Sequence, residues 1–225
     1  SSNWRNTVDL LWFPTGGGKT EAYLGVAAFT IFYRRLTKRE AGKGITVLMR
    51  YTLRMLTAQQ YERAASLICE CDLLRRQENI PGGEISIGLW VGSEVTPNHV
   101  VSDNPDLESA ESILNKLQSG FVDEVKSSPV QLSTCPYCGE VLEPQNAYNI
   151  QKRHFKTHCP NPACPFHEDL PVVTVDDDIY DRKPTLLIGT IDKFARLAWE
   201  EKTKSIFAED GIGFPPDLLI QDELH

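Results

Sequence analysis

The sequence predicts an α/β fold: a mostly parallel β-sheet flanked by helices, with an inserted metal-binding module. Three observations carry this prediction. Short apolar runs of strand length alternate with longer stretches of helical periodicity, as they do in parallel sheets. A glycine-rich turn stands between the first apolar run and the first helical stretch. Four cysteines form two pairs within a segment where that alternation stops.

The composition suits a globular protein with a sizeable core. The chain has 225 residues, 41% of them hydrophobic and 24% charged, and no apolar run reaches the roughly 18 residues that a membrane span needs. The net charge of −8 disfavours a protein that coats DNA. Residues 1–80 nevertheless hold 12 basic and 7 acidic side chains, which indicates either a local basic face or ordinary surface variation. The cysteine spacing suits metal ligands rather than disulfides, so we expect a cytoplasmic protein.

The central motif lies between Val8 and Thr20. An apolar run at 8–13, expected to be a strand, leads into Pro14-Thr15-Gly16-Gly17-Gly18-Lys19-Thr20. Glycines let successive backbone N–H groups converge on an anion, and a helix that begins at Lys19 adds its positive end. We expect Lys19 to reach the β- and γ-phosphates of ATP and Thr20 to bind Mg²⁺. The alternative is a glycine-rich turn that precedes a lysine by chance.

The remaining elements follow from the same patterns. Besides 8–13, the expected strands are 45–49, 85–91, 185–189 and 218–223, with a short strand at 172–175 that returns to the main sheet. The expected helices are 20–39, one that ends near 77, an exposed helix at 107–117, and 191–202. We expect residues 1–96 and 176–225 to form the main domain in two parts and 97–175 to be an insertion.

An acidic pair stands at the end of the last expected strand. Asp222 and Glu223 follow three apolar residues, Leu218 to Ile220, and one glutamine. Because ligands of parallel sheets bind at the carboxyl ends of the strands, this pair is expected near the glycine-rich turn. Asp222 would hold Mg²⁺, largely through water, and Glu223 would polarise the water that attacks the γ-phosphate. The alternative is a solvated acidic strand end.

These two motifs together resemble the superfamily 2 helicases and translocases of DEAD/DEAH type. The resemblance rests on Pro14–Thr20 and on Asp222-Glu223-Leu224-His225, in which leucine replaces the usual alanine. It implies a first RecA-like lobe whose loop from Thr15 to Glu21 binds ATP, and a second RecA-like lobe that completes the site. It also implies two segments that grip a nucleic-acid backbone, here 52–60 and 189–193. The implied contacts are Thr52, Arg54, Gln59, Thr190 and Lys193, although a threonine at such a place can also cap a helix.

A narrower resemblance is to the helicases of DISARM phage-defence systems. It rests on the segments 13–24, 184–195 and 216–225. It implies a role in restricting foreign DNA together with a partner protein of the same system.

The cysteine-rich module at about 133–168 is expected to bind zinc. Cys135-Pro136-Tyr137-Cys138 and Cys159–Cys164 form two knuckles whose thiolates can close a tetrahedron around Zn²⁺. A filled four-thiolate shell makes the site structural, and His167 could replace Cys164 as a ligand. Other residues are expected to be structural only: Cys69, Cys71 and Trp90 in the core, and Asp176–Asp178 as a solvated acidic turn.

The function expected from these features is that of an ATP-dependent helicase or translocase lobe. Lys19 and Glu223 would be its catalytic residues, and single-stranded or unwinding DNA its partner, with RNA as an alternative. The 225 residues alone are expected to bind nucleotide weakly and not to unwind a duplex. The alternative is a regulatory module that is switched by nucleotide and whose zinc ribbon docks a partner protein.

Overall fold

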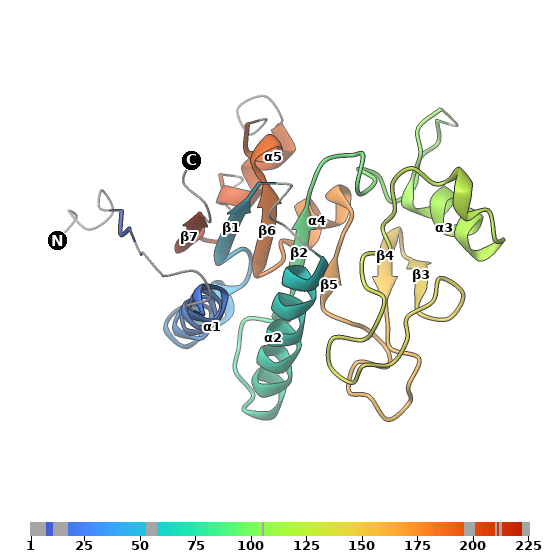
Figure 1. Cartoon of the computed structure of the whole chain (residues 1–225). Helices are drawn as coiled ribbons and strands as arrows, with labels where there is room; N and C mark the ends of the chain where they lie inside the picture. Colours follow the sequence, from blue (N-terminus) through green and yellow to red (C-terminus); the bar gives the residue numbers. More distant parts are fainter. Residues whose placement is uncertain are drawn as a thin grey trace.

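The computed structural model describes residues 8–10, 18–52, 58–104, 106–195, 201–209, 211 and 213–221. A five-stranded sheet forms its centre, with the strand order β5-β2-β6-β1-β7 and every neighbouring pair parallel. The strands are β1 Val47–Tyr51, β2 Ile87–Trp90, β5 Val172–Val173, β6 Leu186–Thr190 and β7 Leu218–Gln221. Figure 1 shows these strands side by side from β7 to β5. The expected parallel α/β fold is therefore confirmed.

Helices cover both faces of this sheet because its strands are apolar on both sides. The alternating side chains of β1 illustrate this: Val47 and Met49 pack in one core cluster, and Leu48 packs in the other. The first cluster contains buried residues of α1 (Lys19–Lys38) and α2 (Ala58–Gln77). The second contains residues of α4 (Asp176–Arg182) and of the 3-10 helix η4 (Glu201–Phe207), with α5 (Ile191–Ala195) packed against it.

The segment between β2 and β5 holds a smaller unit beside the sheet (Figure 1). It contains α3 (Ala110–Gln118), the short 3-10 turn η3 (Val122–Glu124), and an antiparallel hairpin of β3 (Tyr148–Gln151) and β4 (His154–Thr157). A capping box at Ser109 starts α3, whose Ile113 and Leu114 are buried. The helix was expected here as an exposed one, but its inner face joins the first core cluster.

Most expected elements are found within a few residues of their expected bounds. The short strand returning to the main sheet is β5, which pairs with β2. Two expectations differ. Residues 8–10 form no strand, and Val8 and Leu10 are 87% and 78% exposed, so no described element covers them; the rest of that expected strand lies outside the described residues. The helix from 191 is described only to Ala195, and η4 follows from Glu201.

A further short 3-10 helix, η2 (Arg39–Gly42), joins α1 to the strand β1. Among the described helices, none is both long enough and apolar enough to cross a bilayer.

Candidate nucleotide and nucleic-acid site

The glycine-rich turn leads directly into α1. Gly18 has a φ of +72°, a left-handed conformation that suits glycine, and its carbonyl accepts the bond from Ala22 N at 3.0 Å. Lys19 and Thr20 follow in the first helical turn and are half-buried, while Glu21 is exposed. The helix thus begins where the motif requires it. Three other expected nucleotide-binding residues lie outside the described residues: Thr15, Gly16 and Gly17.

The opposite end of α1 shows how the helix is oriented on the sheet. The guanidinium of Arg34 is buried and donates to the carbonyl oxygens of Ile45 at 3.2 Å and Pro215 at 2.9 Å. These carbonyls precede β1 and β7, so the last turns of α1 lie at the amino ends of the strands. The first turn, with Lys19, therefore points toward the carboxyl ends, where parallel sheets bind their ligands.

The first expected nucleic-acid segment follows β1 at that same edge. Thr52 comes directly after the strand and is half-buried, and Gln59 is exposed in the first turn of α2. Arg54 lies outside the described residues. Next to this segment, Glu21 of α1 forms an exposed ion pair with Arg63 of α2 at 2.5 Å.

The second expected segment follows β6 and is more deeply placed. Thr190 pairs in register with Tyr51 of β1, and its hydroxyl is buried without a hydrogen-bond partner in the described part of the chain. The Lys193 side chain is only 7% exposed and forms an ion pair with Asp176 of α4. Its ammonium also lies 5.9 Å from the centre of the Trp90 ring. In the described structure the Lys193 side chain is thus buried against other residues of the protein and is not available at the surface.

The expected acidic pair comes directly after β7 in the sequence. Asp222 and Glu223 lie outside the described residues. The strand that leads to them, β7, ends at Gln221, which pairs with Arg50 of β1. This pairing puts the end of β7 at the same edge as Thr52.

The four cysteines of the inserted module converge on one point. The sulfurs of Cys135, Cys138, Cys159 and Cys164 all lie within 4.8 Å of one another. The Cys138–Cys159 and Cys135–Cys164 sulfurs are 3.4 and 3.9 Å apart. A zinc ion at about 2.3 Å from four tetrahedral sulfurs would hold them about 3.8 Å apart. The cluster could therefore hold a zinc ion, as the spacing predicts.

Tight backbone turns position these thiols. Gly139 N donates to Cys135 O at 2.9 Å, with Gly139 in a left-handed conformation, and Cys164 N donates to Asn161 O at 3.0 Å. Burial raises the pKa of the Cys164 thiol to about 11, so a bound cation would be needed to hold it as a thiolate. His167 stands outside the group: its Nδ1 lies 2.8 Å from the carbonyl oxygen of Cys159. Cys164 is thus the fourth member of the cluster.

A second group of polar residues joins the module to the main sheet, and the sequence analysis missed it. The expected solvated turn Asp176–Asp178 is wrong, because Asp176 and Asp178 are 3% and 2% exposed at the start of α4. Each of the three carboxylates contacts a different element. Asp176 pairs with Lys193 of α5, Asp177 with Lys202 of η4 at 3.0 Å, and Asp178 with His154 of β4 at 2.6 Å. Three consecutive aspartates carry no sequence signal that separates such buried pairing from solvation.

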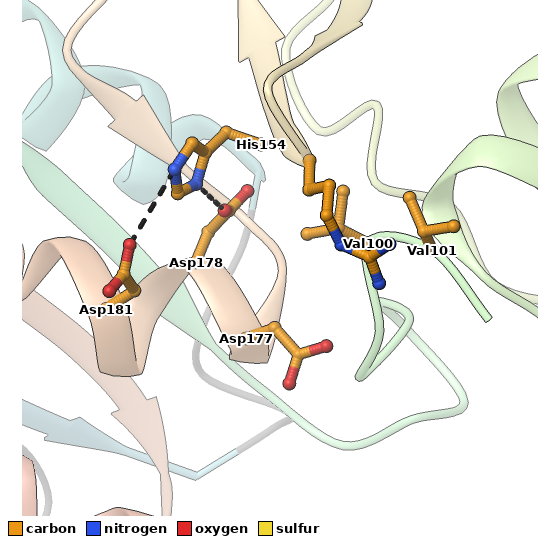
Figure 2. Close-up of a pocket in the computed structure, with 7 residues that line it drawn as sticks. Val100, Val101, His154, Asp177, Asp178 and Asp181 are labelled. Atoms are coloured by element: carbon orange, nitrogen blue, oxygen red, sulfur yellow. Dashed lines mark hydrogen bonds and ion pairs between the residues drawn. The ribbon is translucent and has the colours of Figure 1, made fainter.

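A pocket of about 250 Å³ lies over this junction. Figure 2 shows His154 between Asp178 and Asp181, with Asp177 on the same helix and Val100 and Val101 across the pocket. Burial raises the pKa of Asp178, although the bonds from His154 Nδ1 and Phe155 N oppose that shift. With three aspartates in its lining, the pocket is unsuited to an anion.

The comparisons with known proteins add one relative. No protein-family model matches the chain. The chain is similar to the DISARM protein DrmA. The match is to DrmA of Bacillus paralicheniformis, with 39% identity over 263 aligned positions that include 98% of this chain. The chain spans 23% of the length of that relative. The similarity supports the resemblance to DISARM proteins that the three segments indicate.

Proposed function

We propose that the chain is the first motor lobe of an ATP-dependent helicase or translocase that acts on nucleic acid, DNA in the first instance, in defence against phage. The observation that carries the proposal is the start of α1, where left-handed Gly18 is followed at once by Lys19 and Thr20. A helix N-terminus with this turn favours the binding of phosphate. The identity to DrmA supports the defence context.

Four residues of the chain would have separate roles in ATP hydrolysis. Lys19 would neutralise charge on the β- and γ-phosphates, and Thr20 and Asp222 would hold Mg²⁺, which supplies further charge neutralisation when bound. Glu223 would orient the attacking water and accept its proton. Because phosphoryl transfer depends on placement, a second RecA-like lobe would have to complete the site for turnover.

The nucleic acid would bind along the carboxyl edge of the sheet. Thr52 and Gln59 lie near the end of β1 on this edge, and Thr190, whose hydroxyl is buried, lies at the end of β6. Hydroxyl and amide groups there can hold a sugar–phosphate backbone without reading its sequence. In this proposal Lys193 positions the segment after β6 through its ion pair with Asp176, and does not itself touch the strand.

The test is ATP hydrolysis by the full-length protein with and without single-stranded DNA or RNA. We expect DNA to stimulate hydrolysis, and we expect Lys19→Ala and Glu223→Gln to lower turnover at least about 100-fold. Glu223→Gln should retain ATP binding. The exposed Lys126→Ala variant is the matched control and should hydrolyse ATP at the parental rate.

Two outcomes would contradict the proposal in different ways. Parental turnover in Glu223→Gln would remove that residue from its role. ATP binding without any hydrolysis or nucleic-acid stimulation would favour a nucleotide-switched module that docks a partner protein of the same defence system.

A further inference from the structure

The tip of the β3–β4 hairpin has an unusual composition for its geometry. Gln151 and His154 are paired in register, so Lys152 and Arg153 alone form the turn. Both have positive φ values, +50° and +64°. Two-residue hairpin turns with two positive φ values favour Asn-Gly, because a Cβ atom at positive φ lies too close to the following carbonyl oxygen, and glycine has no Cβ while asparagine can form local hydrogen bonds. The sequence thus has two basic residues at positions where asparagine and glycine would suit the backbone better.

Nothing in the described part of the chain pairs with these two cations. Both side chains are exposed, and neither forms an ion pair or a side-chain hydrogen bond with a described residue. The three carboxylates that line the pocket with Arg153 have other partners: Asp177 pairs with His99 and Lys202, and Asp178 and Asp181 pair with His154. Local salt bridges therefore do not explain the Lys-Arg tip, and residues held in disfavoured conformations can mark functional sites.

The tip lies at the carboxyl edge of the main sheet. The strand β4 runs antiparallel to the chain that forms β5 and enters α4: Leu170 N donates to Thr157 O at 2.7 Å, and Phe155 N donates to Asp178 Oδ2 at 2.8 Å. Since β5 is parallel to β2, α4 starts at the carboxyl ends of both strands. Arg153 shares the pocket of Figure 2 with Val100 and Val101, which come after β2.

The hairpin is also held firmly in this place. The four-cysteine cluster flanks its two strands in the sequence, and Asp178 binds both His154 and Phe155 of β4. Because the backbone of the tip is already held in place, binding of a phosphate chain need not order it, which favours binding. Because aspartates line the pocket below, a phosphate would meet the tip from its outer side.

We propose that Lys152 and Arg153 bind the phosphate backbone of a single nucleic-acid strand that runs along the carboxyl edge of the sheet. This inference rests on the proposed function and extends its nucleic-acid contacts from the ends of β1 and β6 onto the zinc-bearing insertion. Lysine supplies a point charge and arginine a forked pair of donors, and both suit phosphate oxygens.

The test compares two paired variants of the full-length protein. Lys152→Asn/Arg153→Gly removes two charges and suits the turn better, so it should raise the Tm of the zinc-loaded protein while it weakens binding of a fluorescent single-stranded oligonucleotide. The slope of log affinity against log salt should fall by about 1.4, the value for two lost contacts with a single strand. Affinity at low salt should drop by about tenfold or more.

The matched control is Lys38→Asn/Arg39→Gly. This pair is also an exposed Lys-Arg pair with a positive φ, +54° at Arg39, but Lys38 is the last residue of α1, at the amino ends of the strands. It should leave the affinity and the salt slope unchanged. A second variant, Lys152→Gln/Arg153→Gln, keeps the strained turn and should lose affinity without a gain in Tm.

The outcomes separate this inference from the proposed function. Parental binding by both hairpin variants overturns the inference alone, as does an equal loss of affinity in the control pair. A parental protein that binds no nucleic acid overturns the inference together with the proposed function. Loss of affinity and of salt slope confined to the hairpin variants supports it.

Discussion

At the scale of single residues, Asp178 is the contact on which the junction between the inserted module and α4 depends. Its buried carboxylate accepts hydrogen bonds from His154 Nδ1 and Phe155 N. Asp178→Ala leaves the buried Phe155 N–H without a partner, so we expect it to lower the free energy of unfolding by about 2 kcal/mol. Asp181→Ala on the same helix is the control, since Asp181 is 71% exposed, and it should stay within about 0.5 kcal/mol of the parent. Urea unfolding measures the free energy of unfolding of both variants, and an equal loss in the two would contradict the prediction.

The neutral variant Asp178→Asn tests the electrostatics of the same residue. Burial raises the pKa of Asp178 above its ordinary value of 3.8. A carboxyl with a raised folded-state pKa contributes stability that is complete below its unfolded pKa and is lost as the pH rises through its folded pKa. Asparagine does not titrate, so the stability advantage of the parent over Asp178→Asn should shrink as the pH rises above 3.8 and through the raised pKa of Asp178. An advantage that grows over this range would show that the charged form is the favoured one.

At the scale of elements, the buried side chain of Arg34 links the last turns of α1 to the segments before β1 and β7, beside the apolar residues of α1 that pack in the core. Besides Ile45 and Pro215, its guanidinium binds the carbonyl oxygens of Gly42 and Phe214 and the carboxylate of Asp217. Lysine has the charge but not the forked donors, so Arg34→Lys should lower the free energy of unfolding by about 3 kcal/mol.

The midpoint of urea unfolding checks this prediction, with the exposed Arg39→Lys as control. Arg39→Lys should change stability by less than about 0.5 kcal/mol. A similar midpoint for both variants would mean that the bonds of Arg34 contribute little to holding the helix.

Most elements could be predicted from the sequence because their patterns are local. The run Ile45–Met49 predicts β1, the glycines before Lys19 predict the start of α1, and the spacing of the cysteines predicts their cluster. Local patterns do not report which polar residues meet across the fold. The buried pair of Lys193 and Asp176 joins residues 17 positions apart in the sequence, and Lys193 was accordingly expected at a nucleic-acid surface.

At the scale of the whole molecule, the module that contains the four cysteines contacts α2 and α4 of the main domain. On α2, Ser66 Oγ donates to Pro136 O at 2.7 Å and Arg76 lies 5.0 Å from the ring of Phe166. On α4, Asp178 binds the hairpin, while Asp176 of the same helix binds Lys193. A continuous set of contacts therefore leads from the four cysteines to the segment that follows β6.

Removal of the metal should therefore increase local opening outside the module as well as within it. The short, loop-rich segment around the cysteines has little regular structure beyond one hairpin, so bound zinc would supply much of its stability. We expect a chelator to raise amide hydrogen exchange by about tenfold or more in the hairpin and also in α4 and residues 189–195, because local opening spreads through shared contacts. The control is α1, whose contacts with β1 and β7 do not pass through the module and whose exchange should stay unchanged. An increase confined to residues 135–167 would instead mean that the module opens alone, and that the contacts of α4 do not couple it to the edge where nucleic acid is proposed to bind.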